Sequence, residues 1–215
     1  MPEIATIVQA VSVMAACWAI ISGVGAWKRE FIGKRRIELA EQVLAKFFEV
    51  KDAIAFIRNP FSSSEEGKTR QRSDSEPSTE SELLDRSYIV VERYSKKESV
   101  FADFNILKYK FMASFGPETE QIFTDTNKAL SSIFVSARVL AYYWQRQGRV
   151  LMENDKNIDR MHRHQDIFWD TGSDTDEIRV QLKAIQEKLE SATKPCFQEP
   201  VGTFKKITKK CFNSI

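Results

Sequence analysis

The chain has 215 residues, of which 32 are basic and 30 acidic, so its net charge is +2. This balance does not fit a nucleic-acid-binding protein, in which basic residues dominate one face. Glycine (8) and proline (6) are scarce, which favours helices over a β fold with many turns. The three cysteines form no metal-binding or disulfide pattern, as expected in a reducing compartment. We therefore expect an all-α protein.

The first expected element is a transmembrane helix, because residues Ile4 to Trp27 carry no charged side chain. A helix of this length rises roughly 36 Å, enough to cross a hydrocarbon core of about 30 Å. Five cations form its C-terminal flank: Lys28, Arg29, Lys34, Arg35 and Arg36. By the positive-inside rule, the N-terminus lies outside and the rest of the chain in the cytoplasm. Residues 1–34 are thus the predicted anchor and its basic flank.

Two other interpretations of this segment fit its sequence less well. A secretory signal peptide carries positive charge before its apolar run, whereas this chain has Glu3 there. The tetrapeptide at 14–17 loosely resembles a bacterial lipoprotein cleavage site, but the apolar run continues for ten residues beyond Cys17. We therefore expect the segment to remain uncleaved.

Small residues recur at every fourth position of the expected span, at Ala15, Ala19 and Gly23. This spacing lets two helices approach closely, so it predicts self-association within the bilayer. The alternative is that small residues are simply common in membrane spans. No proline separates Trp27 from Arg58, so the anchor should run almost directly into the next helix, with Gly33 as its weakest point.

Apolar residues at helical spacing predict a cytoplasmic helical domain over residues 35–193. We expect an antiparallel four-helix-type bundle, because each apolar stripe needs a partner and the connections are short or polar. A serine- and charge-rich loop should occupy residues 61–79. Ser173 or Asp174 should cap the last helix, and Pro195 should prevent its long continuation. The expected helices are Arg35–Arg58, Ser81–Phe115, about Pro117–Gly148 and Asp174–Ala192.

Several short motifs lie between residues 35 and 116: Arg58-Asn59-Pro60-Phe61, Glu66-Gly67 with Arg70, Glu92-Arg93-Tyr94 and Phe111-Met112. Together they resemble the motifs of an uncharacterised group of bacterial single-span membrane proteins with a helical cytoplasmic domain. The resemblance implies a bacterial inner membrane and transfers no catalytic residue.

Five charged residues around the loop are candidate interaction residues: Arg58, Glu66, Arg70, Glu92 and Arg93. If the loop folds back, Glu66 can pair with Arg93, or Arg70 with Glu92, to form a recognition surface. The alternative is a solvated loop whose surface ion pairs contribute about 0–1 kcal/mol each. The polar composition of the loop favours this alternative.

The segment 155–170 contains both histidines of the chain. On a helix, Asp159, His162, Asp166 and Asp170 share a face, and such groups can bind a divalent metal. However, His162 and His164 cannot face the same way on a helix, and no H-E-x-x-H motif is present. We therefore expect surface polarity beside three apolar residues that dock on the bundle, and no metal or cofactor.

The C-terminal tail, residues 194–215, alternates apolar residues with Lys205, Lys206, Lys209 and Lys210. A basic amphipathic segment can lie on an anionic membrane surface and gain about 1 kcal/mol per cation. The alternative is a disordered, solubilising terminus.

No phosphate-binding loop, nucleophile elbow or paired-carboxylate motif is present. The leading hypothesis is therefore a non-enzymatic, membrane-anchored helical bundle that binds or scaffolds proteins at the cytoplasmic face. It needs the lipid bilayer and a protein partner or further copies of itself, but no nucleic acid. One alternative is an oligomerising membrane effector of the stress or defence type, triggered from the cytoplasm. A second is a metal-dependent enzyme using residues 155–170.

Overall fold

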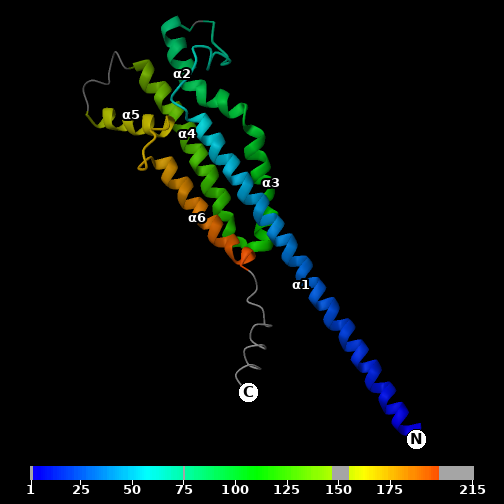
Figure 1. Ribbon diagram of the computed structural model, residues 1–215. Coiled ribbons are helices and arrows are strands. Elements are labelled where there is room, and N and C mark those ends of the chain that lie inside the picture. The colour runs from blue at the N-terminus through cyan, green and yellow to red at the C-terminus, as the bar shows by residue number, and fades with distance from the viewer. Residues whose placement is uncertain (1, 75, 147–154, 199–215) are drawn as a thin grey trace. The chain divides into compact units, whose positions relative to one another are not determined.

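The computed structural model describes residues 2–74, 76–146 and 155–198, and these are helices and connecting loops without a β-strand (Figure 1). The expected all-α class is confirmed. The chain divides into two compact units, residues 1–41 with 194–215 and residues 42–193. Helix α1 (Pro2–Ile57) contributes to both units.

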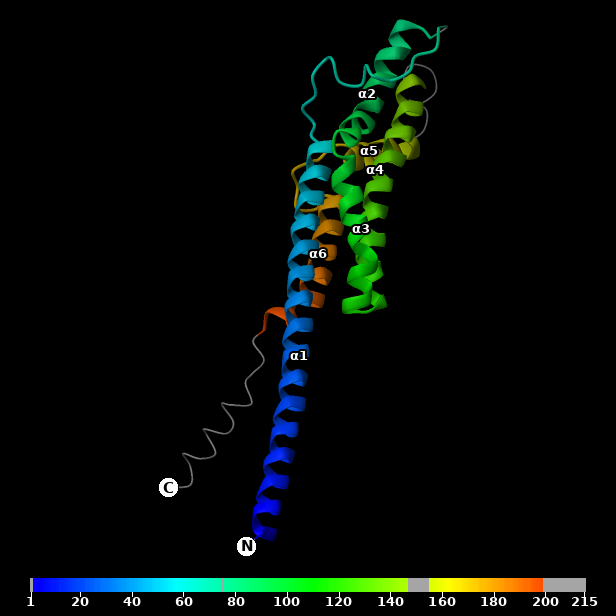
Figure 2. The same cartoon turned by 90° about the vertical axis from the view of Figure 1, so that its right-hand side faces the viewer.

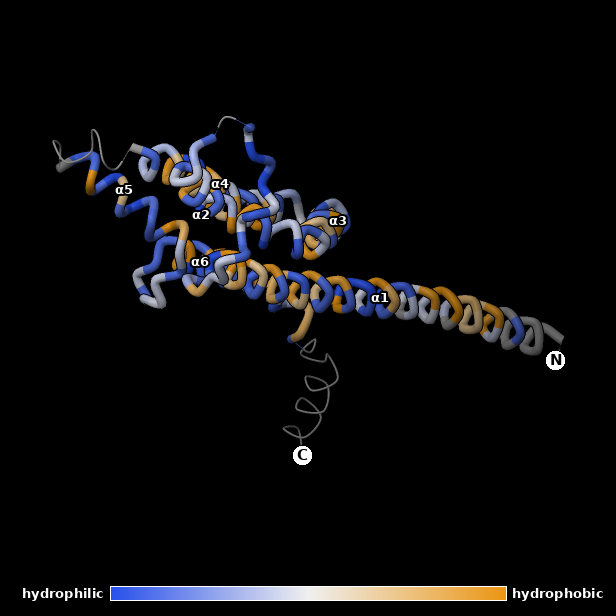
Figure 3. Tube along the Cα trace, turned by 90° about the horizontal axis from the view of Figure 1, so that it is seen from above, coloured by the Kyte–Doolittle hydropathy of each residue, from blue (hydrophilic) through white to orange (hydrophobic). Residues whose placement is uncertain are grey.

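The N-terminal part of α1 presents apolar side chains that no other part of the described chain covers. Trp18 is 73% exposed, Ile21 is 72% exposed and Trp27 is 64% exposed. Figure 3 shows apolar residues recurring along α1. Over Val11–Ile57, this helix is long and apolar enough to cross a membrane, and none of its most apolar window is buried. It is the single described helix with these properties.

The second unit has a core built on the predicted apolar stripe of α1. Val43, Phe47, Val50, Ile54 and Ile57 are all at most 1% exposed. They pack in a unit with further described elements, of which Figures 1 and 2 show the helices ending at Phe115 and Phe197 running beside this part of α1. These elements are α2 (Ser78–Ser95), α3 (Glu98–Phe115), the 3₁₀ helix η1 (Pro117–Thr119), α4 (Glu120–Arg146), α5 (Asp155–Phe168) and α6 (Glu177–Phe197).

Aromatic contacts connect three of these helices across the core. Phe104 of α3 lies 6.0 Å from Phe47 of α1 and 4.6 Å from Phe123 of α4, between ring centroids. Phe111, two turns further along α3, lies 6.1 Å from the same Phe123 ring. Such aromatic pairs add to the stabilisation that burial alone provides. The predicted stripes of these helices therefore close one core.

The prediction of a single helix over Ser81–Phe115 is wrong, because the structure breaks it between α2 and α3. Lys97 has φ −122° and ψ 6°, outside the helical region. Its amide donates to the carbonyl of Tyr94, three residues back, at 2.8 Å. The polar run 95–98 offers no apolar side chain that would hold a continuous helix against the core. Lys97 instead lies over the ring of Phe56, at 5.4 Å.

The predicted start of the last helix is also wrong. Helix α6 begins at Glu177, and Asp176 is its cap, because Asp176 Oδ1 accepts the amide of Arg179 at 3.0 Å. Neither Ser173 nor Asp174 has that role. The helix continues through Pro195 to Phe197, since a proline near a helix end removes few hydrogen bonds.

Candidate functional site

The 59–77 loop, described except at position 75, folds back on α2 through a glycine. Gly67 has φ +87°, and its amide donates to Glu92 Oε2 at 2.8 Å. A Cβ atom at this position would lie 2.0 Å from the carbonyl oxygen of Asp85. Only glycine therefore permits both this backbone conformation and this close approach to α2.

Arg93 of α2 holds the other half of the loop from inside the protein, where it is 2% exposed. Its guanidinium makes two bonds to Glu66, from Nε at 3.0 Å and from Nη2 at 2.7 Å. The remaining donors reach the carbonyls of Phe56, Ile57, Asn59 and Phe61. Arg93 thus satisfies carbonyls that the end of α1 leaves free and ties them to the loop.

This arrangement favours the charged form of Glu66. Hydrogen bonds from Arg93 lower the pKa of Glu66, although partial burial opposes the shift. Doubly bonded arginine–carboxylate pairs fix both partners in orientation as well as in position. The Glu66–Arg93 pair is therefore a rigid tie, unlike exposed ion pairs such as Lys68–Glu65.

A second network holds the distal part of the loop. Arg70 Nε donates to Asp85 Oδ1 at 3.1 Å, and Arg70 Nη1 donates to Glu76 Oε2 at 3.0 Å. Arg72 also pairs with Asp85, and Ser81 Oγ donates to Glu76 at 2.6 Å. The hydrogen bonds from Arg70 and then Ser81 lower the pKa of Glu76 to about 2. This network joins the loop to the first turns of α2.

Arg58, just after α1, organises the ends of α5 and α6. It is 2% exposed, and its Nε and Nη2 donate to the carbonyls of Asp166, Ile167 and Trp169 at 2.7–2.9 Å. Its Nη1 and Nη2 also bind both carboxylate oxygens of Asp176 at 2.8 and 2.7 Å. One arginine thereby caps the end of α5 and holds the residue that caps the start of α6.

Burial alone would raise the pKa of Asp176, but the bonds from Arg58 outweigh it, and amides add to them. The result is a pKa lowered to about 2. The side chains of Arg58 and Asp176 are 2% and 0% exposed. A charge pair this deep is tolerated because nearly every donor and acceptor is satisfied.

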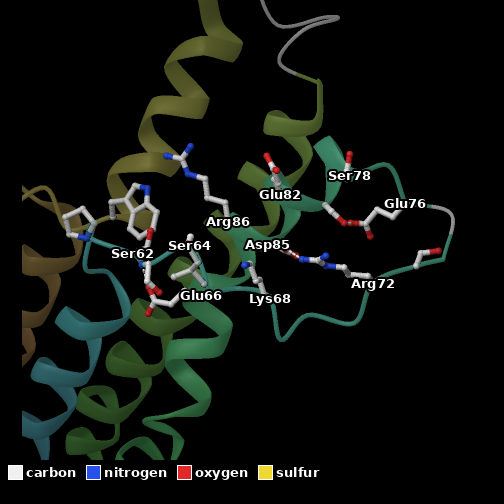
Figure 4. Close-up of a pocket in the computed structure, with 16 residues that line it drawn as sticks. Ser62, Ser64, Glu66, Lys68, Arg72, Glu76, Ser78, Glu82, Asp85 and Arg86 are labelled. Carbon is white, nitrogen blue, oxygen red and sulfur yellow. Dashed lines mark hydrogen bonds and ion pairs between the residues drawn. The ribbon is translucent and has the colours of Figure 1, made fainter.

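The loop and the start of α2 enclose an open groove of about 1050 Å³ (Figure 4). Arg93 and Glu66 place its Pro60–Ser64 wall, and Arg58 places Trp169 by binding its carbonyl oxygen. The far end is formed by Arg72, Glu76 and Asp85. The groove is therefore shaped by the buried arginines, which do not themselves reach its surface.

Aromatic rings connect this groove to the core. The guanidinium of Arg86 lies over the ring of Trp144, 4.8 Å from its centroid. Trp144 contacts Phe168 edge to face at 5.8 Å, and Phe168 contacts Trp169 edge to face at 4.4 Å. Arg86 and Trp169 both line the groove. A continuous series of side-chain contacts through Trp144 and Phe168 thus fixes them.

The structure brings together most of the predicted loop residues. The Glu66–Arg93 pair is present, whereas the alternative pairing of Arg70 with Glu92 is wrong. Arg70 binds Glu76 and Asp85, and Glu92 accepts the amide of Gly67 and the hydroxyl of Thr69. The favoured prediction of a solvated loop is right in that most of its side chains are exposed, but the prediction of marginal ion pairs is wrong, because the buried guanidinium of Arg93 pairs with Glu66.

The predicted metal ligands lie on or just after α5 and serve separate contacts. His164 Nδ1 lies 3.0 Å from Ser136 Oγ, and Asp170 pairs with Arg179 at 2.8 Å. Burial, followed by the charges of neighbouring arginines, lowers the pKa of His164. His162 is exposed. Within the described residues, no group of three such side chains is placed to hold a metal ion.

The remaining predicted residues belong to the other unit. Ala15 and Gly23 are exposed on α1, as are Lys28, Arg29, Lys34, Arg35 and Arg36. Ala19 lies in α1, but its side chain is outside the described set. The tail lysines at 205, 206, 209 and 210 lie outside the described residues.

Sequence reasoning missed several residues that build the groove: Glu76, Asp85, Arg86, Trp169 and Asp176. The signal for Asp85 was weak, because this residue, 7% exposed, shares the buried side of α2 with other polar residues, Ser81, Ser87 and Arg93. Trp169 and Asp176 gave none, because their roles depend on contacts with Arg58, more than 100 positions earlier.

No protein-family model, curated protein or solved structure matches the chain. The resemblance to bacterial single-span membrane proteins therefore stays a prediction.

Proposed function

We propose that this chain is a non-enzymatic, membrane-anchored protein that binds a partner protein through the 59–77 loop and its groove. The observation that carries the proposal is the buried Arg93–Glu66 tie, which fixes the loop around an open groove. A surface fixed before binding loses little conformational entropy when a partner arrives. The groove is open and mixes polar with apolar surface, as protein-binding surfaces do, and so differs from the enclosed apolar pockets of small ligands.

The anchor part of the proposal is supported by the exposed apolar surface of α1. Side chains such as Trp18 and Ile21 are more than 70% exposed, and a contiguous apolar surface of this kind marks a membrane or protein contact. The length of the helix suits a bilayer. Its basic C-terminal flank favours a cytoplasmic bundle and an N-terminus outside the inner membrane.

Partner binding is tested by a photoreactive amino acid placed at Lys68, on the groove, in the full-length protein in its own membranes. Position Lys110, exposed on α3, is the matched control. We expect one discrete adduct from position 68 that is absent at 110 and is lost when Gly67→Ala disturbs the loop. Equal adducts from both positions, or none from position 68, would contradict the proposal. An adduct between two copies of this chain would identify the partner as the chain itself.

The anchor is tested by cysteine labelling in a variant without native cysteines. A membrane-impermeant maleimide should label Glu3→Cys in intact cells, and Lys68→Cys only after the membrane is opened. The reverse pattern would overturn the orientation. Release of the protein by alkaline carbonate would show that α1 does not span the bilayer.

A further inference from the structure

Arg86, at one end of the groove, has a guanidinium for which the described residues provide no hydrogen-bond acceptor. Among the described residues, Arg86 donates no hydrogen bond, and its contact is the stacking on Trp144 at 4.8 Å. Stacking restrains the guanidinium while leaving its N–H donors free. An arginine held in this way has already lost much of the side-chain entropy that binding would cost.

The groove's carboxylates near the loop are already committed to other cations. Glu66 is bound by Arg93, while Glu76 and Asp85 are bound by Arg70 and, for Asp85, also by Arg72. Glu82 is the remaining lining carboxylate, and Figure 4 shows the guanidinium of Arg86 pointing away from it. The positive charge of Arg86 is therefore available to a group that enters the groove.

Apolar and hydroxyl groups line the same groove as this cation. They include the ring of Pro60, the indole of Trp169 and the hydroxyls of Ser62 and Ser64. No hydrogen bond of either hydroxyl is found within the described chain. We call Arg86, Trp169, Pro60, Ser62 and Ser64 the Arg86 subsite. It combines a free planar cation, two free hydroxyl donors and an apolar wall.

We propose that the Arg86 subsite binds a carboxylate side chain in an acidic segment of the partner protein, with a neighbouring apolar side chain of that segment packed on Trp169. A guanidinium matches a carboxylate with two parallel hydrogen bonds, and the serine hydroxyls can donate to the same oxygens. This inference rests on the proposed function and specifies the chemistry that the partner presents.

The test measures binding of a fluorescein-labelled peptide, Gly-Asp-Leu-Glu-Phe-Gly, to the detergent-solubilised full-length protein by fluorescence polarisation at one salt concentration. The comparison peptide is Gly-Asn-Leu-Gln-Phe-Gly, which has the same shape without the charge. We expect saturable binding of the acidic peptide. Its affinity should fall about 10- to 100-fold when the peptide loses its carboxylates or when the protein loses the Arg86 guanidinium. Trp169→Ala should weaken binding of the acidic peptide as well.

Arg86→Gln is the decisive variant, and Arg138→Gln, exposed on α4 away from the groove, is its control. Both should unfold at the temperature of the wild-type protein within a few degrees, because both side chains are exposed. The inference is overturned if Arg86→Gln binds the acidic peptide as the wild type does, if the amide peptide binds equally, or if binding does not saturate. Displacement of the peptide by millimolar inorganic phosphate would overturn the carboxylate assignment in favour of a phosphoryl group.

Failure of the inference is distinguishable from failure of the proposed function. If the adduct from position 68 forms with Arg86→Gln as it does with the wild type, the partner uses the loop but not the Arg86 subsite. If no adduct forms in either protein, the proposed function itself fails.

Discussion

Buried arginines are costly unless each N–H finds an acceptor, because the guanidinium cannot lose its charge. Arg58 and Arg93 meet this condition in the same way, with one carboxylate and several carbonyl oxygens each. The carbonyls come from the last residues of helices and from the residues just after them, where the helical pattern of backbone hydrogen bonds ends. Each arginine therefore stabilises a helix end and, through it, one wall of the groove.

The pair of Asp176 with Arg58 predicts a loss of stability in acid. The folded protein holds the pKa of Asp176 at about 2, below the value of 3.8 for an unperturbed aspartate. The unfolded chain therefore binds a proton more readily, so this stabilisation is complete above about pH 4 and is lost as the pH falls toward 2. The loss is on the order of 2 kcal/mol.

Urea unfolding of the solubilised full-length protein between pH 6 and pH 2 checks this prediction. Asp176→Asn should lower stability at pH 6 and make its decline in acid shallower than that of the wild type. The exposed neighbour Asp174 supplies the control Asp174→Asn, which should change neither. Parallel curves for Asp176→Asn and the wild type would contradict the assignment.

Gly67 is the residue at which the loop is most sensitive to a single methyl group. Gly67→Ala places a Cβ 2.0 Å from the backbone oxygen of Asp85, in addition to the cost of a positive φ. Gly172 shares the positive φ, at 72°, but a Cβ there meets no atom within 4 Å. Gly172→Ala therefore isolates the conformational cost, which is about 1–2 kcal/mol.

We expect Gly67→Ala to destabilise the loop by clearly more than Gly172→Ala destabilises its own turn. Limited proteolysis within residues 59–77 for Gly67→Ala, and within the turn at Gly172 for Gly172→Ala, measures the difference, because cleavage follows the population of locally open states. The geometry described for Gly67 would be wrong if both variants were cleaved in this loop at the wild-type rate.

At the scale of elements, Arg93 joins the end of α1, the 59–77 loop and α2. Arg93→Met keeps much of the side-chain volume but leaves Glu66 and four carbonyls without their donor. We expect hydrogen exchange of the amides from Ser63 to Arg70 to accelerate by at least 10-fold, because their tie to α2 is lost. Amides in the middle of α4 should exchange more nearly as in the wild type.

The control for Arg93→Met is Lys96→Met, one turn further along α2. Lys96 is 53% exposed and forms an ordinary surface pair with Glu92, which contributes little. Its loss should leave the loop amides protected. Equal acceleration in both variants would show that any charge on this face of α2 holds the loop, and would remove the special role of Arg93.

The sequence predicts elements better than it predicts their connections. The stripe from Val43 to Ile57 is buried as expected, because a repeat of three and four residues requires one buried helix face. The break at Lys97 was less visible, since lysine and serine are compatible with a continuing helix. The cap at Asp176 depends on Arg58, far away in the sequence. Local sequence patterns cannot predict a contact between residues so far apart in the chain.

For the candidate site too, the sequence predicts which residues are involved better than it predicts their contacts. Five charged residues around the loop were recognisable as candidates, but the sequence could not show that Arg58 and Arg93 are buried. Because Arg58 and Arg93 are buried, their role is to position the groove surface. In the proposed function, Arg86 and Trp169 contact the partner instead. Those two residues are brought together by ring contacts through Trp144 and Phe168, which have no sequence signature.

At the scale of the whole molecule, α1 supplies both the apolar surface and the helix end that the loop is built on. Under the proposed function, in which α1 spans a membrane, a partner bound to the loop is held at that membrane, as a scaffold requires. The oligomerising effector remains the second function that this architecture permits. The two differ in what the apolar part of α1 must do, because a tether needs only length and hydrophobicity, whereas an effector needs a helix–helix contact.

Gly23 separates these two functions. In the described chain, a Cβ at Gly23 meets no atom within 4 Å, so Gly23→Leu costs nothing within one copy. Between two copies, the larger side chain would separate helices that approach through Ala15 and Gly23. For an effector, we expect Gly23→Leu to abolish disulfide cross-linking between copies that carry Ser12→Cys as their single cysteine, because residue 12 lies on the same helix face as Ala15, Ala19 and Gly23. Val24→Leu, an exposed apolar neighbour on another face, is the control and should leave the cross-link intact. If neither variant changes cross-linking, or if the Ser12→Cys protein itself shows none, α1 acts as a tether, and the effector hypothesis fails while the scaffold stands.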